Sequence, residues 1–176
     1  MKTTPRNRQD VIGDIISEYE LTQGAEIGVG TGPTTNALLS RFPDLHWLAV
    51  DSWPAGLPLH YGGELSAEQQ SERRALFMRV KERHGARLDL LELPSLDAAP
   101  LINDGALDLV FIDADHSYEG CKADIIAWRP KLRPGGWLMG HDYCPKNFPG
   151  VVQAVDELVP GAKIDVDFVW MKRVAA

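Results

Sequence analysis

Short apolar runs of strand length alternate with helical segments along most of this chain. Strands are predicted at residues 25–29, 45–50, 87–93, 107–112 and 137–139. Helices are predicted between them, at residues 32–41, 67–84, 95–103 and 118–128. Consecutive strands joined by helices pair in parallel through right-handed crossovers. The pattern therefore predicts an α/β fold with a doubly wound, mostly parallel sheet and helices on both faces.

The two ends of the chain add further elements to this prediction. Apolar residues at helical spacing predict a first helix over residues 7–20, and another helix is expected at 151–159. Residues 163–174 alternate as one or two strands, in which two aspartates, Asp165 and Asp167, face away from the apolar residues Ile164, Val166 and Phe168.

The connections and the core are also predicted from composition. Residues 52–66 contain two prolines and three glycines, so this stretch is predicted to be loop. Residues 133–136 are expected to form a turn that leads into the strand at 137–139. The helix at 67–84 is expected to point Leu76, Phe77 and Val80 inward, and three tryptophans are assigned to the core: Trp128, Trp137 and Trp170.

The composition describes one domain over residues 1–176. With 44% hydrophobic residues, a chain of this length needs neither a disulfide nor a structural metal, and Cys121 and Cys144 are predicted to be free thiols in a reducing compartment. No signal peptide or membrane-length apolar run is found, so we expect a cytoplasmic protein with no membrane partner. A net charge of −7 argues against nucleic acid as a partner, and the basic stretch at 73–87 is interpreted as a solvated helix face.

A glycine-rich turn follows the first predicted strand. Residues 26–32 read Glu-Ile-Gly-Val-Gly-Thr-Gly, and the missing side chains let a ligand approach the backbone and the start of the next helix. Asp51 ends the second strand, where a carboxylate can accept hydrogen bonds from both hydroxyls of a ribose. Pro33 replaces the last glycine of the dinucleotide fingerprint, and a P-loop lysine is absent. These features favour an adenosine-containing cofactor other than NAD or ATP.

The order of these motifs resembles that of the class I, Rossmann-like S-adenosylmethionine-dependent methyltransferases. The glycine turn and Asp51 are followed by the segments Leu-Asp-Leu-Val-Phe-Ile-Asp at 107–113 and Leu-Arg-Pro-Gly-Gly at 132–136. Residues 111–120 and 140–143 are similar to a subset of small O-methyltransferase-like proteins related to macrocin-type and cephalosporin-biosynthesis enzymes. The resemblance implies the Rossmann-like methyltransferase fold and S-adenosylmethionine as cofactor.

The resemblance also implies which residues hold the cofactor. The glycines would line its methionine and ribose, Asp51 would bind the ribose, and Glu26 would support the turn or the cofactor amine. Ser95 would bind the adenine edge, although a serine at this position is equally suited to cap a helix. The predicted cofactor-binding residues are Glu26, Gly28, Val29, Gly30, Gly32, Asp51, Ser52, Ser95 and Asp113.

Methyl transfer to a hydroxyl needs alignment of the acceptor and removal of its proton. Asp113, His116 and His141 follow predicted strands and are the candidate catalytic residues. Asp113 and Asp142 could hold a divalent metal, as corresponding positions hold magnesium in the catechol-type O-methyltransferases. Because His141 stands where those enzymes have another carboxylate or amide ligand, a softer metal than magnesium is also considered.

Other residues on these loops are assigned either a structural role or a role in ligand binding. Asp115 is interpreted as a helix N-terminal cap. In the loop after Asp51, three side chains could cover the adenine, line an acceptor pocket or simply pack within the loop: Trp53, His60 and Tyr61. In the other loop beside the site, Tyr143, Cys144 and Phe148 could face the acceptor.

The leading functional hypothesis is methyl transfer from S-adenosylmethionine to a small-molecule acceptor, at a hydroxyl oxygen. The alternatives are an NAD(P)-dependent oxidoreductase and a non-catalytic module that binds S-adenosylmethionine or a partner. The first helix, the loop at 52–66 or a second subunit must close the pocket, and a homodimer is predicted.

Overall fold

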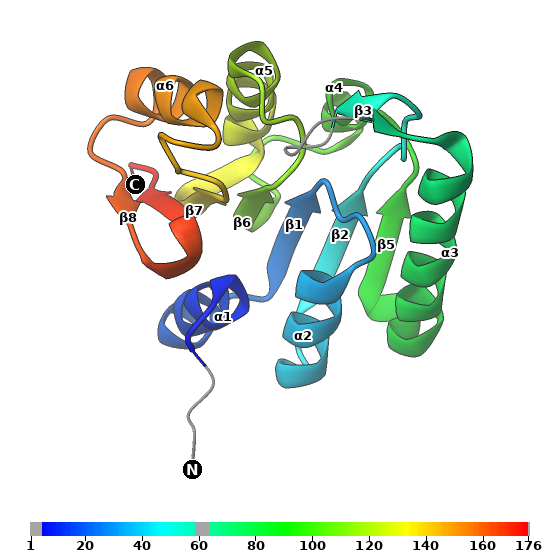
Figure 1. Ribbon diagram of the computed structural model, residues 1–176. Helices are drawn as coiled ribbons and strands as arrows, with labels where there is room; N and C mark the ends of the chain where they lie inside the picture. Colours follow the sequence, from blue (N-terminus) through cyan, green and yellow to red (C-terminus); the bar gives the residue numbers. More distant parts are fainter. Residues whose placement is uncertain (1–4, 59–63, 176) are drawn as a thin grey trace.

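The computed structural model describes residues 5–58 and 64–175, and its centre is a seven-stranded sheet. Figure 1 shows this sheet between the helices. The strand order is β5-β2-β1-β6-β7-β9-β8. The five strands from β5 to β7 run parallel, whereas β9 runs antiparallel to both of its neighbours. The bounds of these strands are β1 Gln23–Ile27, β2 His46–Val50, β5 Leu88–Leu91, β6 Leu107–Ile112, β7 Leu132–Gly140, β8 Lys163–Ile164 and β9 Trp170–Arg173.

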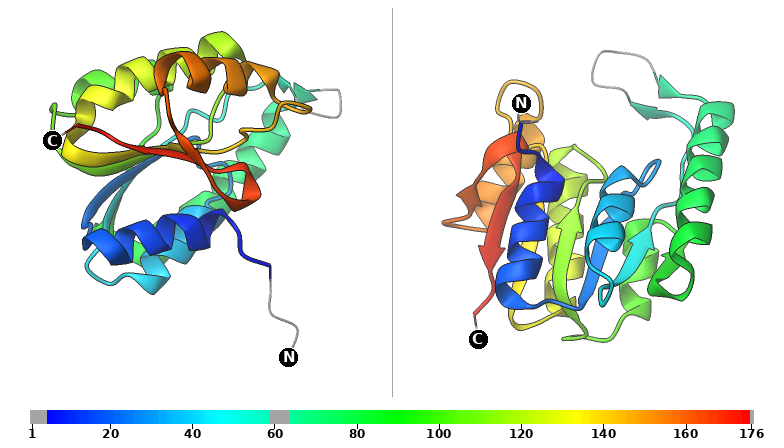
Figure 2. Two further views of the ribbon diagram at one scale, coloured as in Figure 1. Left: turned by 90° about the vertical axis from the view of Figure 1, so that its left-hand side faces the viewer. Right: turned by 90° about the horizontal axis from the view of Figure 1, so that it is seen from below.

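Helices cover both faces of the sheet, as the sequence predicts. Figure 2 shows α1 and α2 on one face and α5 and α6 on the other. Each face has its own apolar core: Phe77 and Trp47 belong to one, Trp128 and Trp170 to the other. The helices are α1 Arg8–Tyr19, α2 Pro33–Arg41, α3 Ala67–His84, α4 Ser95–Ala98, α5 Tyr118–Trp128 and α6 Pro149–Leu158. The predicted doubly wound α/β fold is confirmed.

Strand order reverses between β1 and β6, and this reversal determines where a ligand can bind. From β1 the chain moves outward through β2 to β5, and then returns to the other side of β1 as β6. The loops after β1 and β6 therefore leave the sheet in opposite directions and open a crevice at its carboxyl edge.

Side-chain caps fix where three of the helices begin. Asn7 accepts hydrogen bonds from the backbone of Gln9 and Asp10 at the start of α1. Ser66 caps α3 and Ser117 caps α5 in the same way. Asp115, which was predicted to be the cap of α5, instead accepts a hydrogen bond from the backbone N–H of Ser117. That prediction was wrong by two residues.

The connection at 52–66 is not entirely loop. Leu57–Pro58 (β3) and Glu64–Leu65 (β4) form a short antiparallel pair, and the N–H of Gly56 donates to the carbonyl of Leu65. Strands of two residues are too short to show an alternating pattern, which is why the sequence did not reveal them. His60 and Tyr61 lie outside the described residues.

The structure also corrects the predicted end of the chain. Of the one or two strands predicted over residues 163–174, two are present, β8 and β9, but a 3₁₀ turn at Val166–Phe168 interrupts the alternation between them. Asp167 and Phe168 are both left-handed, with φ of 56°, so the chain reverses there. The apolar side chains of this segment, Ile164, Val166 and Phe168, are exposed.

Smaller corrections concern β7, the tryptophans and α3. The strand β7 begins at Leu132, so the predicted turn at 133–136 lies within it, beside a register shift in its pairing with β6. Trp137 is only partly buried, whereas Trp128 and Trp170 are fully buried. Leu76 of α3 is 47% exposed, because it lies on the solvent side of the helix next to the fully buried Phe77.

Two further expectations concern the cysteines and the absence of a membrane-spanning helix. Cys121 and Cys144 are buried free thiols. Among the helices of residues 5–58 and 64–175, none has the length and apolar composition that crossing a membrane requires.

The two adjacent positions on α3 provide a test of how this helix is oriented. We expect Phe77→Ala to lower the free energy of unfolding by about 3–5 kcal/mol, because it leaves a cavity in the core. Leu76→Ala should change it by no more than about 0.5 kcal/mol, because that side chain is exposed. Urea unfolding of both variants measures the difference, and equal effects would contradict the assigned orientation.

Candidate active site

A cavity of about 680 Å³ opens at the carboxyl edge of the sheet, where strand order reverses. The loops after β1, β2, β5 and β6 form its walls together with Arg8, Arg73 and part of α5. Eight of the predicted site residues line it: Gly28, Val29, Gly30, Asp51, Ser52, Ser95, Asp113 and His116. Four others lie outside its wall: Glu26, Gly32, His141 and Asp142.

The backbone conformation of the glycine turn requires glycine at its first two glycine positions. Gly28 has a φ of +87°, and a Cβ there would lie 2.2 Å from the carbonyl oxygen of Asp113. Gly30 is also left-handed, and its N–H donates to Asp51 Oδ2 at 2.9 Å. The turn is therefore held between the loops after β6 and β2, with its backbone facing the cavity.

Asp51 is oriented by two backbone donors. Besides the N–H of Gly30, the N–H of Trp53 donates to Asp51 Oδ1 at 2.8 Å. These bonds fix a carboxylate on the cavity wall at the end of β2, which is the position predicted for binding ribose hydroxyls. Trp53 itself is buried beneath the turn, where its Nε1 donates to the carbonyl of Gly30 and its ring packs against Phe77.

Glu26 lies under the glycine turn and is 2% exposed. Thr35 of α2 donates a hydrogen bond to its carboxylate at 2.5 Å. Burial raises the pKa of Glu26 to about 8, although the Thr35 hydrogen bond opposes this rise. The negative charge of Asp113 adds a smaller increase, and the positive charge of Arg8 a smaller decrease. Of the two roles predicted for Glu26, this placement matches support of the turn.

The hydroxyl group of Ser95 forms hydrogen bonds with other side chains of the protein. Its hydroxyl donates to Asp124 Oδ1 at 2.5 Å and accepts from Trp128 Nε1 at 2.8 Å. It does not cap α4, because Pro94 occupies the N-cap position. Asp124 also lines the cavity, and burial raises the pKa of its carboxyl group to about 6. Asp124 was not predicted as a site residue, although its spacing from the core residue Trp128 places both on the inner face of α5.

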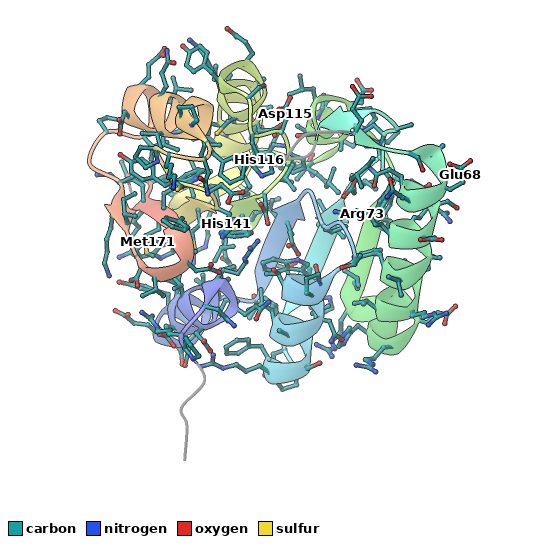
Figure 3. All side chains as sticks on the ribbon, viewed as in Figure 1. Glu68, Arg73, Asp115, His116, His141 and Met171 are labelled. Carbon is teal, nitrogen blue, oxygen red and sulfur yellow. The ribbon has the colours of Figure 1, made fainter. Side chains whose placement is uncertain are left out.

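Opposite the glycine turn, acidic and basic side chains from distant parts of the sequence form a cluster. His116 Nε2 lies 2.7 Å from Asp142 Oδ2 and 3.7 Å from Asp113 Oδ1. His141 Nδ1 lies 2.9 Å from Asp142 Oδ1 and 3.7 Å from Asp113 Oδ1. Figure 3 shows the two histidines at the ends of β6 and β7, with Arg73 on α3 across the site. The structure thus brings together all the predicted catalytic and metal-binding residues.

His116 and Asp142 shift each other's pKa in opposite directions. Burial would lower the pKa of His116, but hydrogen bonds to Asp113 and Asp142 and their negative charges raise it to about 9. Burial would raise the pKa of Asp142, but its contacts with His116 and His141 hold it well below the usual range. Asp142 has a φ of 62°, an unfavourable backbone conformation for a residue other than glycine, and strain of this kind is typical of functional sites.

Two arginines of the site were not predicted. Arg8 Nη1 donates to Asp113 Oδ2 at 2.6 Å across 105 residues of sequence, so no local pattern could reveal this contact. Arg73 was interpreted as part of a solvated helix face, but it lines the cavity next to Gly30.

The residues after β7 flank the cluster without lining the cavity. The ring of Phe148 lies 4.7 Å from that of His116, measured between centroids. The Tyr143 hydroxyl donates to Asp156, and Cys144 is buried.

A metal ion could be held by three of these residues. Ligand atoms of Asp113, His141 and Asp142 lie within 4.8 Å of one another. His141 is 8% exposed, and although its Nδ1 lies 2.9 Å from Asp142 Oδ1, neither ring nitrogen makes a well-aligned hydrogen bond within the described part of the chain. Two carboxylates and an imidazole suit a transition metal better than magnesium. The predicted metal thus stays a prediction, with His141 as a third candidate ligand.

Comparison with known proteins gives the class of this protein. A family model described as a methyltransferase domain matches residues 25–143, which include the glycine turn, Asp51 and the charged cluster. The chain therefore belongs to the methyltransferase domain family, and the predicted class of S-adenosylmethionine-dependent methyltransferase is confirmed.

Solved structures support the fold. A candidate O-methyltransferase from Klebsiella pneumoniae has a TM-score of 0.71 at 17% identity, covering 99% of this chain and 83% of that one. A methyltransferase from Podospora anserina with S-adenosylhomocysteine bound has a TM-score of 0.67 at 16% identity, covering 99% and 81%. The TDP-rhamnose 3′-O-methyltransferase of calicheamicin biosynthesis has a TM-score of 0.64 at 16% identity, covering 95% and 81%.

One match found by sequence comparison covers a smaller part of the chain. The uncharacterized protein y4gI of Sinorhizobium fredii is 29% identical over 94 residues, which are 53% of this chain. Those residues are only 10% of that protein, so this chain matches a small part of its length.

Glu26 makes the stability of the protein depend on pH. Its raised pKa means that folding takes up a proton, so its contribution to stability is complete below about pH 4.5 and is lost as the pH rises towards 8. We expect Glu26→Gln to gain about 3 kcal/mol of unfolding free energy relative to the wild type between pH 4.5 and pH 7. Urea unfolding at the two pH values measures this gain. Glu82→Gln, at an exposed position of α3, is the matched control, and an equal gain there would contradict the explanation.

Proposed function

We propose that this chain transfers a methyl group from S-adenosylmethionine to a hydroxyl oxygen of a small-molecule acceptor. One observation carries the proposal: a single cavity is lined on one side by the glycine turn and Asp51, and on the other by Asp113 and His116. Its volume is in the range of small-molecule sites, about 300–1,000 Å³.

The cofactor would lie along the glycine turn. Exposed backbone at Gly28 and Gly30 leaves room for its methionine part, and Asp51 can accept hydrogen bonds from the ribose hydroxyls. The adenine would lie towards the loop after β5, where Ser95 and Asp124 line the wall. Because the Ser95 hydroxyl is already bonded to Asp124 and Trp128, the adenine would be bound by backbone groups or by the second carboxylate oxygen of Asp124.

The acceptor would lie against the charged cluster. In the reaction, the acceptor oxygen forms a bond to the methyl carbon as the bond from that carbon to sulfur breaks, and S-adenosylhomocysteine leaves. The hydroxyl proton passes to a base. Asp113 and His116 line the cavity and can touch the acceptor, whereas His141 lies behind them and can only orient Asp113 and Asp142.

Several related expectations belong to the same proposal. A metal ion held by Asp113, His141 and Asp142 would be an alternative means of lowering the pKa of the acceptor hydroxyl, but it is not part of the proposed reaction, because no step above requires one. Oxygen as the accepting atom is supported by the names of similar structures, among them the O-methyltransferase NovP. We also propose that the chain acts as a homodimer, without nucleic acid or membrane as partner; the charge of −7 supports the exclusion of nucleic acid.

Calorimetric titration with S-adenosylmethionine, S-adenosylhomocysteine and NAD tests the cofactor assignment. We expect the first two ligands to bind and NAD not to bind. Asp51→Ala should weaken S-adenosylhomocysteine binding by about 100-fold, because two hydrogen bonds to a charged group are lost. Binding of NAD alone would instead support the oxidoreductase alternative.

Two further variants show whether the weaker binding comes from the loss of ribose contacts. Asp51→Asn keeps an acceptor for the N–H of Gly30 while removing the charge, so it separates ribose binding from support of the turn. Asp44→Ala removes an exposed aspartate just before β2 and should bind the cofactor as the wild type does. Unchanged binding by both Asp51 variants would contradict the assignment.

A further inference from the structure

Arg8 brings a permanent positive charge into the charged cluster from the first turn of α1. Its Nη1 donates to Asp113 Oδ2 at 2.6 Å, and its Nε and backbone N–H donate to Asp167 Oδ2 at 3.3 and 3.1 Å. It also lines the cavity. The planar guanidinium can bond both carboxylates at once, so Arg8 adds a fixed positive charge to the cluster.

The fold holds Arg8 in this position from both sides. Asn7 caps α1 and so fixes the helix turn that carries Arg8. On the other side, Asp167 and Phe168 are both left-handed, an unfavourable conformation for residues with a side chain, and this turn presents Asp167 to Arg8. Arg6 adds an exposed ion pair between the same two segments, through Asp165.

Arg8 stands beside the place where a metal ion would bind. The candidate ligands are Asp113, His141 and Asp142, and the guanidinium is in direct contact with the first of them. The cluster therefore already contains a cation that neutralises part of its negative charge. A divalent ion bound to Asp113 would lie a few ångströms from a fixed positive charge, and in a partly buried site such like charges repel strongly.

We propose that Arg8 is the resident cation of this cluster and keeps a divalent metal ion out of it. In place of a metal, the guanidinium supplies the positive charge beside the acceptor oxygen. This second statement rests on the proposed function, whereas the exclusion of metal is a property of the cluster itself and can be measured without an acceptor.

Manganese binding tests the proposal, measured by electron paramagnetic resonance and calorimetry with Mn²⁺ as the probe. We expect the wild-type protein to bind Mn²⁺ only weakly, with a Kd on the order of millimolar. Arg8→Gln should bind Mn²⁺ at least about tenfold more tightly, because the repelling charge is gone. Arg8→Lys keeps the charge and should behave as the wild type does.

A matched control comes from the same segment. Arg6→Gln also removes one positive charge, but Arg6 pairs with Asp14 and Asp165 outside the cavity, so Mn²⁺ binding should not change. An equal gain in Arg6→Gln and Arg8→Gln would mean that only the net charge of the protein matters, and this would overturn the proposal.

Two other results would also overturn it. One is micromolar Mn²⁺ binding by the wild-type protein, which decides the question even where Arg8→Gln does not fold. The other is Mn²⁺ binding by a folded Arg8→Gln variant that is no tighter than that of the wild type. Titration with S-adenosylhomocysteine and thermal melting report the fold of each variant. If the wild-type protein does not bind S-adenosylhomocysteine, this result counts against the proposed function. The Mn²⁺ comparison does not depend on it.

Discussion

The site depends on hydrogen bonds that continue the sheet by one residue beyond the end of each strand. The N–H of Gly28 donates to Val50, that of Asp113 to Ile27, and that of His141 to Ile112. The first residue of each loop is thus held at the same level of the sheet. Three loops that carry the glycine turn, Asp113 and His141 therefore start from fixed positions, and their side chains need little further ordering to meet at one edge.

The close contact between Gly28 and the carbonyl of Asp113 adds to this constraint. A side chain at position 28 would collide with backbone, which cannot move aside as a flexible side chain can. The two central strands therefore separate only beyond this contact, and the cavity opens there. Cofactor groups would lie on the Gly30 and Asp51 side, and the charged cluster lies on the Asp113 side, so one backbone contact separates the two halves of the site.

Much of this arrangement could be predicted from the sequence, because it depends on local patterns. The parallel strands and the helices between them follow from apolar periodicity, and their carboxyl ends indicate where Asp51, Asp113 and His116 would meet. Two strands do form after residue 162, as predicted, but the turn between them was missed, because the left-handed conformation at Asp167 and Phe168 follows no periodic pattern. Leu76 was wrongly placed inward because it precedes the buried Phe77 on a helix that is mostly charged.

The parts of the site that the sequence did not reveal are contacts between distant segments. Arg8 reaches Asp113 and Asp167 only because α1 packs beside the strands that carry the cluster, and no spacing in the sequence records this. The role of Ser95 was open between adenine binding and helix capping. The structure gives its hydroxyl a third role, between Asp124 and Trp128, which depends on how α5 packs against α4.

The contact between Arg8 and Asp167 spans 159 residues of the chain, and this has a consequence for folding. During synthesis, the glycine turn, Asp51 and the contact of Arg8 with Asp113 can form once the central strands have paired, whereas the second partner of Arg8 is present only when residue 167 is available. Contacts of such long sequence separation form late, because a large loss of chain entropy precedes them. The acceptor half of the site is therefore completed after the cofactor half, and a partly folded chain would hold Arg8 through Asp113 alone.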